Sequence, residues 1–201
     1  MRLAGSLHWG NAMALQRWSI DSVHSRIGFH VRHLMISNVH GRFEKWEGMV
    51  EFDPDEPMRS RVLITIDAAS IDTREPQRDA HLRSREFFDV ESHPTITFET
   101  HEVERHTLDD YEVAGNLTIC GITRRLVLDV KRSQVIVDHQ GNQRIAFAVA
   151  GAISRKDFGL TWNFMLETGG VMVGDKVAIT AELEAVRLPE TRQVPASAAL
   201  K

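Results

Sequence analysis

The sequence of 201 residues is poor in several features that define whole classes of protein. Its single cysteine, Cys120, cannot form an internal disulfide and supplies no cysteine-rich zinc framework. No run of residues approaches the roughly 20 apolar residues that span a bilayer. Lys and Arg number 24 against 28 Asp and Glu, so the net charge of −4 gives no general attraction to nucleic acid or to anionic lipid. We therefore expect a folded globular chain that neither spans a membrane nor binds nucleic acid.

The two ends of the chain lack the patterns of an ordered element. In residues 1–18, polar residues such as Ser6 and Gln16 interrupt the continuous apolar run of about 7–15 residues that a signal peptide needs, so we expect a cytoplasmic protein. Residues 188–201 contain Pro189 and Pro195 and show no strand or helix period. The sequence therefore predicts mobile segments at 1–16 and 188–201 around one domain at 17–187.

Within this domain, apolar side chains recur at every second position, which is the period of a β-strand with one buried face. In residues 25–33, Ile27, Phe29, Val31 and His33 share one face. The alternation recurs in further segments, which bring the total to about eight strands: 39–52, 62–66, 96–98, 113–119, 126–130, 144–155 and 179–183. Most connections are too short for helical crossovers, so the strands are mainly antiparallel. They must hide their apolar faces either by closing into a barrel or by pairing two sheets.

One interval departs from this period. Pro76 suits the first turn of a helix, and Pro94 suits a stop beyond its end. We therefore expect one helix at about 76–90, docked on the strands by apolar side chains: Ala80, Leu82, Phe87 and Phe88.

The side chains expected to face inward are of very different sizes. Phenylalanines form the large group, and the small group has two glycines and an alanine: Phe29, Phe43, Phe98 and Phe147, against Gly41, Gly115 and Ala181. An eight-stranded barrel encloses an interior that side chains just fill or that holds one slender ligand. The small residues leave room for a ligand, whereas a sealed apolar core explains the alternation equally well. The spacing alone leaves both interpretations open.

Segments throughout the domain resemble one known family. In chain order they are DSVHSRIGFHVRHL at 21–34, VHGRF at 39–43, SIDT at 70–73, RDAHLRSREFFD at 78–89, HPTITFET at 93–100, GNLTICGIT at 115–123, ISRKDFGL at 153–160 and VGDKVAITAELEA at 173–185. Over nearly all of 18–187 the chain resembles the YceI-like family of polyisoprenoid-binding proteins. The resemblance implies an all-β fold, an eight-stranded antiparallel lipocalin-like barrel whose apolar lumen takes an isoprenoid chain. It also implies a homodimer, which family members often form.

The alternation and the resemblance together predict the residues that contact such a ligand. In the lumen they are Ile27, Phe29, Val31, Phe43, Val62, Ile64, Ile66, Ile96, Phe98, Val113, Leu117, Ile119, Phe147 and Leu183. A polar head at the mouth would be held by hydrogen bonds or charge. The candidates for this role are His33, Arg78, His81 and Arg155, each of which has an ordinary alternative as a satisfied core histidine or a surface cation. Because alternation sends His30 and His33 to opposite faces, we expect no histidine metal site.

These features predict a protein that binds, stores or carries a long-chain isoprenoid lipid, of the polyprenyl phosphate or isoprenoid quinone type, without a catalytic cofactor. Two alternatives stay open. One is an enzyme acting on a lipid, a hydrolase or an isomerase, although no G-x-S-x-G or H-E-x-x-H motif is present. The other is a stress-related interaction protein with a filled barrel.

Overall fold

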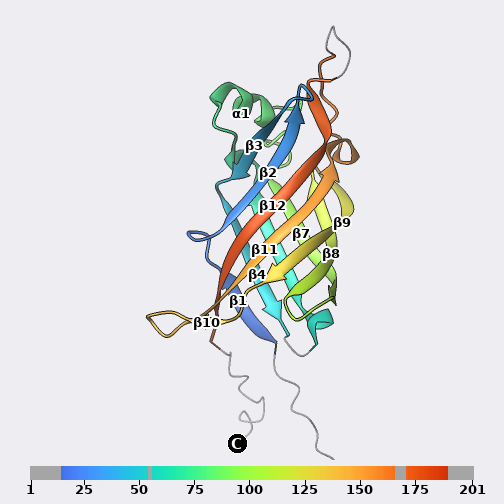
Figure 1. Ribbon diagram of the computed structural model, residues 1–201. Coiled ribbons are helices and arrows are strands. Elements are labelled where there is room, and N and C mark those ends of the chain that lie inside the picture. The colour runs from blue at the N-terminus through green and yellow to red at the C-terminus, as the bar shows by residue number, and fades with distance from the viewer. Residues whose placement is uncertain (1–14, 54–55, 166–170, 190–201) are drawn as a thin grey trace, which may run out of the picture.

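In a computed structural model, the structure describes residues 15–53, 56–165 and 171–189. These residues form twelve strands in one sheet and one α-helix, α1 (Pro76–Arg83) (Figure 1). The strands are β1 (Gln16–Ile20), β2 (Arg26–His33), β3 (Ser37–Phe43), β4 (Trp46–Phe52), β5 (Arg61–Asp67), β6 (Ile71–Asp72), β7 (Thr95–Arg105), β8 (Asp110–Ile119), β9 (Ile122–Arg132), β10 (Ile136–Val137), β11 (Gln143–Ser154) and β12 (Val173–Arg187). Three short 3-10 helices join them: η1 (Pro57–Arg59), η2 (Ala68–Ser70) and η3 (Arg155–Phe158).

The sheet closes into a barrel because β12 pairs with β11 on one side and with both β1 and β2 on the other. β1 and β2 follow each other along β12, and β4 and β3 pair with them in turn. β1 and β2 together occupy one strand position in the barrel, and β3 and β4 together occupy another. Counted in this way, the barrel is closed, antiparallel and eight-stranded. This confirms the predicted fold class.

The predicted strand at 39–52 is two strands, which is a correction. The chain leaves the ladder at Glu44 and Lys45, whose backbone N–H groups donate to the carbonyl and the hydroxyl of Ser70 (3.1 and 3.0 Å). As a result β3 pairs with β6 rather than with β5. The short strands β1, β6 and β10 were absent from the prediction, because two to five residues are too few to establish a period.

The predicted helix at 76–90 is also corrected. It begins as expected at Pro76, where the Glu75 side chain accepts hydrogen bonds from the N–H groups of Gln77 and Arg78, but it ends at Arg83. Ser84 has an extended backbone, and the turns after it bring Phe87 and Phe88 to the barrel. Within the helix Ala80 is exposed and the buried residue is Asp79, so α1 does not dock through a continuous apolar face.

Most of the two segments predicted to be mobile, residues 1–14 and 190–201, lies outside the described residues. Of the rest, Gln16 opens β1, and the Leu188 N–H donates to the Arg17 carbonyl (2.8 Å). Among the described residues, the structure contains no helix with the length and apolar character needed to cross a bilayer.

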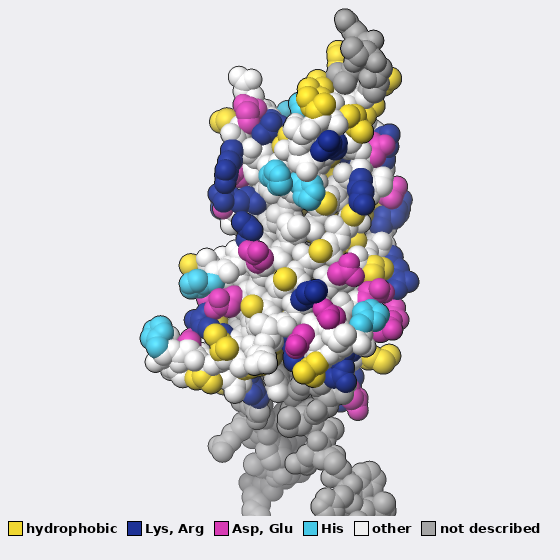
Figure 2. Space-filling model, in the orientation of Figure 1, with side chains coloured by type: hydrophobic (Ala, Val, Ile, Leu, Met, Phe, Trp, Pro, Cys, Tyr) yellow, Lys and Arg dark blue, Asp and Glu magenta, His cyan; other side chains and the backbone are white. Residues whose placement is uncertain are grey.

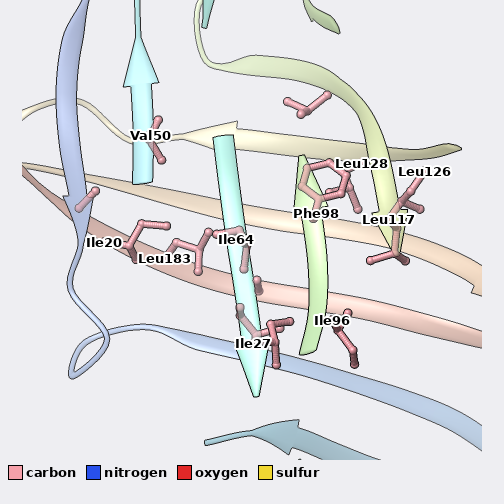
Figure 3. Packing of buried hydrophobic residues seen from close by; sticks show 14 of the residues in the cluster. Ile20, Ile27, Val50, Ile64, Ile96, Phe98, Leu117, Leu126, Leu128 and Leu183 are labelled. Carbon is pink, nitrogen blue, oxygen red and sulfur yellow. The ribbon is translucent and has the colours of Figure 1, made fainter. Parts of the chain in front are cut away.

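One end of the barrel, where β1 begins and β12 ends, is filled by side chains. We call this end the floor, and its residues, all buried, are Trp18, Phe52, Tyr111, Ile145 and Ala185. The rings of Phe52 and Tyr111 meet edge to face at 6.3 Å, and the Arg132 guanidinium lies 5.5 Å above the Phe52 ring. Above the floor, apolar side chains from several strands point into the barrel (Figure 3), whereas the outer face shown in Figure 2 carries charges of both signs.

Candidate functional site: an apolar cavity

Between the floor and α1, the barrel encloses a cavity of about 260 Å³. Among the described residues, every side chain in its wall is aliphatic or aromatic except that of Arg155. The wall includes all of the residues predicted to face the lumen, from Ile27 on β2 to Leu183 on β12. Their position around a cavity is therefore established, and their contact with a ligand stays a prediction.

Sequence reasoning missed a second group of wall residues. Some lie on strands whose alternation is plain, although these residues were not among those predicted to line the lumen: Leu126, Leu128, Val130, Val149, Ile153 and Ile179. Others carry no strand period because they come from α1, from turns and loops, or from an irregular strand: Leu82, Phe87, Phe88, Leu160 and Val173. Val173 faces the cavity because β12 bulges, so that Val177 pairs with Val31 while Val173 pairs with His33.

The two glycines predicted to leave room for a ligand do not do so. A Cβ on Gly41 would lie 2.3 Å from the Phe29 ring, and one on Gly115 would lie 2.7 Å from the Phe98 ring. The rings lie over these glycines and occupy the space that they provide. Ala181, the third small residue, does line the cavity.

Arg155, the charged residue in the wall, is 3% exposed and fully engaged. Its five N–H groups have five acceptors: the carbonyls of Gly174 (3.0 Å), Leu160, Trp162 (2.8 Å) and Val173 (3.3 Å), and the Asp175 carboxylate (3.3 Å). Burial lowers the pKa of the guanidinium, and the charge of Asp175 opposes that shift. Because each donor is used, Arg155 fastens the chain that follows η3 to the barrel rim and offers no N–H to a ligand.

The other three head-group candidates lie outside the cavity wall. Arg78 donates to the hydroxyl (2.7 Å) and the carbonyl (2.8 Å) of Thr73. The His81 Nε2 atom lies 2.6 Å from a Glu86 carboxylate oxygen. His33 pairs with Val173 at the rim. The structure does not gather the four candidates around one polar pocket, and a head-group role stays a prediction for Arg78, His81 and His33.

Two segments that lie mostly outside the strand ladders cover the end of the cavity opposite the floor. The first, which we call the helix cap, is residues 76–93 and contributes Leu82, Phe87 and Phe88 to the wall. The second, the loop cap, is residues 155–165 with 171–173 and contributes Arg155, Leu160 and Val173. In Figure 1 the helix cap lies beside β2 and β3 at this end of the barrel.

The two caps meet through three aromatic rings. The His81 ring meets the Trp162 ring edge to face at 4.8 Å and the Phe87 ring edge to face at 5.0 Å. The Phe87 and Trp162 ring centres lie 5.4 Å apart. His81 and Phe87 belong to the helix cap and Trp162 to the loop cap, so the contact joins them across the end of the cavity.

A polar cluster lies where the turn between β1 and β2 crosses β12. Asp21, His24 and Glu184 each place one potential metal-ligand atom here. These three atoms lie within 4.8 Å of one another, a spacing that could hold a cation. The Arg144 guanidinium already contacts both carboxylates, at 3.0 Å from Asp21 and 2.5 Å from Glu184. Hydrogen bonding from His24, and then from Arg144, lowers the pKa of Asp21 to about 2. The cluster is therefore an ion-pair network centred on an arginine.

A closed antiparallel barrel with an apolar cavity and a helix over one end is a lipocalin-like barrel. The chain belongs to the YceI-like domain family, whose pattern matches residues 18–185, and this confirms the resemblance seen in the sequence. A UPF0312 protein of Staphylococcus epidermidis is 36% identical over 171 residues, which cover 85% of this chain and 97% of that protein.

Two solved structures share the fold. Burkholderia cenocepacia BcnA superimposes with a TM-score of 0.73 at 24% identity, covering 82% of this chain and 98% of that one. A polyisoprenoid binding domain from Saccharophagus degradans superimposes with a TM-score of 0.62 at 16% identity, covering 85% of this chain and 98% of that one. Both likenesses concern the fold.

Proposed function

We propose that this protein binds and carries a long-chain isoprenoid lipid, of the polyprenyl or isoprenoid quinone type, in its barrel cavity. The observation that carries this proposal is the apolar cavity of about 260 Å³ between the floor and the two caps. An apolar cavity of about 150 Å³ is enough to bind benzene in another protein, so a larger one suits a slender hydrocarbon. The polyisoprenoid binding domain that shares the fold supports the same choice of ligand.

The energy of such binding comes from hydrocarbon burial. At ~0.8 kcal/mol per CH₂ group, one isoprene unit of five carbons contributes about 4 kcal/mol before the cost of ordering the chain. Affinity therefore rises with chain length up to the capacity of the cavity. A wall of this kind discriminates weakly between similar chains, because one methylene changes the binding energy by only about 1–3 kcal/mol.

The wall also indicates which part of the ligand it takes. Arg155 has no free N–H, and the rest of the wall, over the part of the chain that the structure describes, offers no charged side chain. A phosphate moved into this wall would lose its hydration without gaining a partner. The hydrocarbon chain therefore enters the cavity, and the polar head stays outside the wall at the caps.

The same wall bears on the two alternatives. A filled barrel does not suit a cavity of this size. Among the described residues, the wall brings no carboxylate, histidine or thiol to the cavity that would serve as an acid, base or nucleophile, so the geometry favours binding over lipid chemistry.

Organic extraction of the purified protein, followed by mass spectrometry, tests the proposal. We expect a co-purified isoprenoid, or, when the protein is purified from a host that lacks a suitable one, saturable uptake of added geranylgeraniol. An extract free of long-chain lipid, together with no uptake of geranylgeraniol or of a ubiquinone, would overturn the proposal.

A further inference from the structure

We propose that the contact between His81, Phe87 and Trp162 is a gate, and that a ligand enters and leaves the cavity when these rings separate and the helix cap parts from the loop cap. The inference rests on the proposed function, since it concerns the route to the same cavity. In this proposal, the three ring residues control how fast a ligand enters and leaves the cavity.

The other boundaries of the cavity are closed by contacts that are costly to break. The floor is filled by buried side chains, of which Trp18 and Ile145 are 1% exposed. Around most of the wall the strands are joined by continuous hydrogen-bonded ladders, such as the pairing of β11 with β12 from Arg144 to Ser154. Passage through either boundary requires local unfolding of the core.

Two neighbouring pairs of strands lose their pairing towards the capped end. β9 and β11 pair only between Asp129–Arg132 and Phe147–Ala150, and beyond that point η3 contacts both strands and buries Phe158. β3 pairs with β6 instead of β5, and the helix cap follows directly after β6. The two caps therefore lie over these gaps, and the seam between the caps crosses the same end of the cavity.

Each cap is anchored firmly to the barrel at its own base. In the helix cap, Arg83 donates to the carbonyls of Ala69 (2.7 Å) and Ile71 (2.6 Å). In the loop cap, Arg155 donates to the Gly174 carbonyl (3.0 Å) and the Asp175 carboxylate (3.3 Å) of β12. The Asn163 side chain also bonds the backbone of Val173, the first residue of β12, through its amide nitrogen (2.7 Å) and its oxygen (3.1 Å).

The seam itself is held differently. Within the described parts of the two caps, no hydrogen bond or ion pair joins one cap to the other, and the contact consists of rings. Ring pairs of this kind contribute only about 0.5–1.5 kcal/mol beyond the area they bury. The seam therefore lacks the polar contacts that hold each cap to the barrel.

In the structure the seam is closed. Ring centres 4.8 and 5.4 Å apart are in van der Waals contact. A hydrocarbon chain passing between them would need about 3.5–4.0 Å between its carbons and the ring atoms on each side. The chain can pass only when the rings move apart, so the separation of the caps sets the rate of exchange.

A cross-link across the seam tests the gate. We would replace Cys120 by Ala, introduce His81→Cys and Trp162→Cys, load the protein with dansyl-labelled geranylgeraniol, and join the two cysteines with a short bismaleimide. Release of the probe into excess unlabelled geranylgeraniol, followed by stopped-flow fluorescence, should slow at least tenfold relative to the same variant capped with N-ethylmaleimide.

The matched control carries Thr118→Cys and Thr123→Cys in the same background. Their hydroxyls lie 2.8 Å apart across β8 and β9 on the outside of the barrel, so the cross-link there should leave the release rate unchanged. Equal release rates with and without the cross-link between positions 81 and 162 would overturn the gate. Failure of the wild-type protein to take up the probe would instead overturn the proposed function.

A single substitution gives a second measurement that needs no cross-link. Trp162→Ala removes two of the three ring contacts, and we expect both the uptake rate and the release rate of the probe to rise several-fold. Rates equal to those of the wild-type protein would count against the gate even if the cysteine variant failed to fold.

Discussion

At the scale of single residues, Arg155 shows how one side chain can belong to the cavity wall and still be unavailable to a ligand. Its acceptors are mostly backbone carbonyls: those of Leu160 and Trp162, which lie outside the strands, and those of Val173 and Gly174 at the start of β12. Buried carbonyls without a donor cost free energy. Arg155 supplies the donors for four of them at once.

Arg155→Met should therefore destabilise the protein by roughly 3 kcal/mol, because the carbonyls of Leu160, Trp162 and Gly174 lose the donor that Arg155 supplies. Urea unfolding measures the loss, and hydrogen exchange should show faster opening of residues 160–163. Lys156→Met is the control: Lys156 is an exposed neighbour paired with Asp175 at 2.8 Å, and its loss should cost under ~1 kcal/mol. Equal effects of the two substitutions would argue against the role given to Arg155.

Asp21 gives a prediction about pH. Its pKa is lowered from 3.8 to about 2 in the folded protein, so its ion pairs stabilise the fold fully above pH 3.8 and are lost as the pH falls towards 2. Asp21→Asn should lower the melting temperature at pH 7, and the difference from wild type should shrink between pH 4 and pH 2. Asp129→Asn, at an exposed position on β9, should show no such pH-dependent difference. A constant difference for Asp21→Asn down to pH 2 would contradict this assignment.

The sequence predicted the residues of the wall well and their polar contacts poorly, for a physical reason. Alternation reports which face of a strand a residue such as Ile64 or Phe98 occupies, and burial follows from the face. The acceptors of Arg155 and the ring over Gly41 depend instead on segments that come together only in the fold. No local pattern contains that information.

At the scale of elements, the helix cap depends on a buried carboxylate more than on an apolar helix face. Asp79 is 6% exposed and accepts hydrogen bonds from the Thr73 N–H (2.9 Å) and the Thr73 hydroxyl (2.5 Å). The predicted helix ran to residue 90 because Phe87 and Phe88 were assigned to it. They lie instead in turns, whose geometry a helical period does not describe.

Asp79→Ala should lower the free energy of opening of the helix cap by about 2 kcal/mol, because the Thr73 donors lose their acceptor in a buried site. Amide hydrogen exchange over residues 73–83 should accelerate, while exchange in β8 and β9 stays slow. Gln77→Ala, at an exposed position of α1, should change the free energy of opening measured by exchange by no more than ~0.5 kcal/mol. Unchanged protection in Asp79→Ala would show that apolar contacts alone hold the cap.

At the scale of the whole molecule, the barrel divides each strand into a side that faces the cavity and a side that faces water. Two alanines on paired strands mark the two sides: Ala181 on β12 lines the cavity, and Ala150 on β11 is exposed. The closed barrel was predictable, because eight one-sided strands have few ways to hide their apolar faces. The interruption of the ladders at the capped end was not, since it depends on where β3 leaves the wall.

These two alanines allow a matched test of the cavity. Ala181→Phe places a ring in the cavity and should lower affinity for geranylgeraniol by at least tenfold, with a smaller loss for the shorter geraniol. Ala150→Phe adds the same ring outside and should leave both affinities unchanged. Fluorescence titration measures them, and equal affinities in the two variants would place the ligand elsewhere.

The filled floor has a consequence for how cargo would be exchanged. A cavity with a single entrance cannot release its ligand to an acceptor while it receives ligand from a donor. Loading and unloading must therefore alternate. Exchange through this protein should then follow ping-pong kinetics, with an empty form as an obligatory stage between donor and acceptor. A barrel open at both ends would allow a ligand to enter at one end and leave at the other. Trp18 and its buried neighbours block that path at the floor.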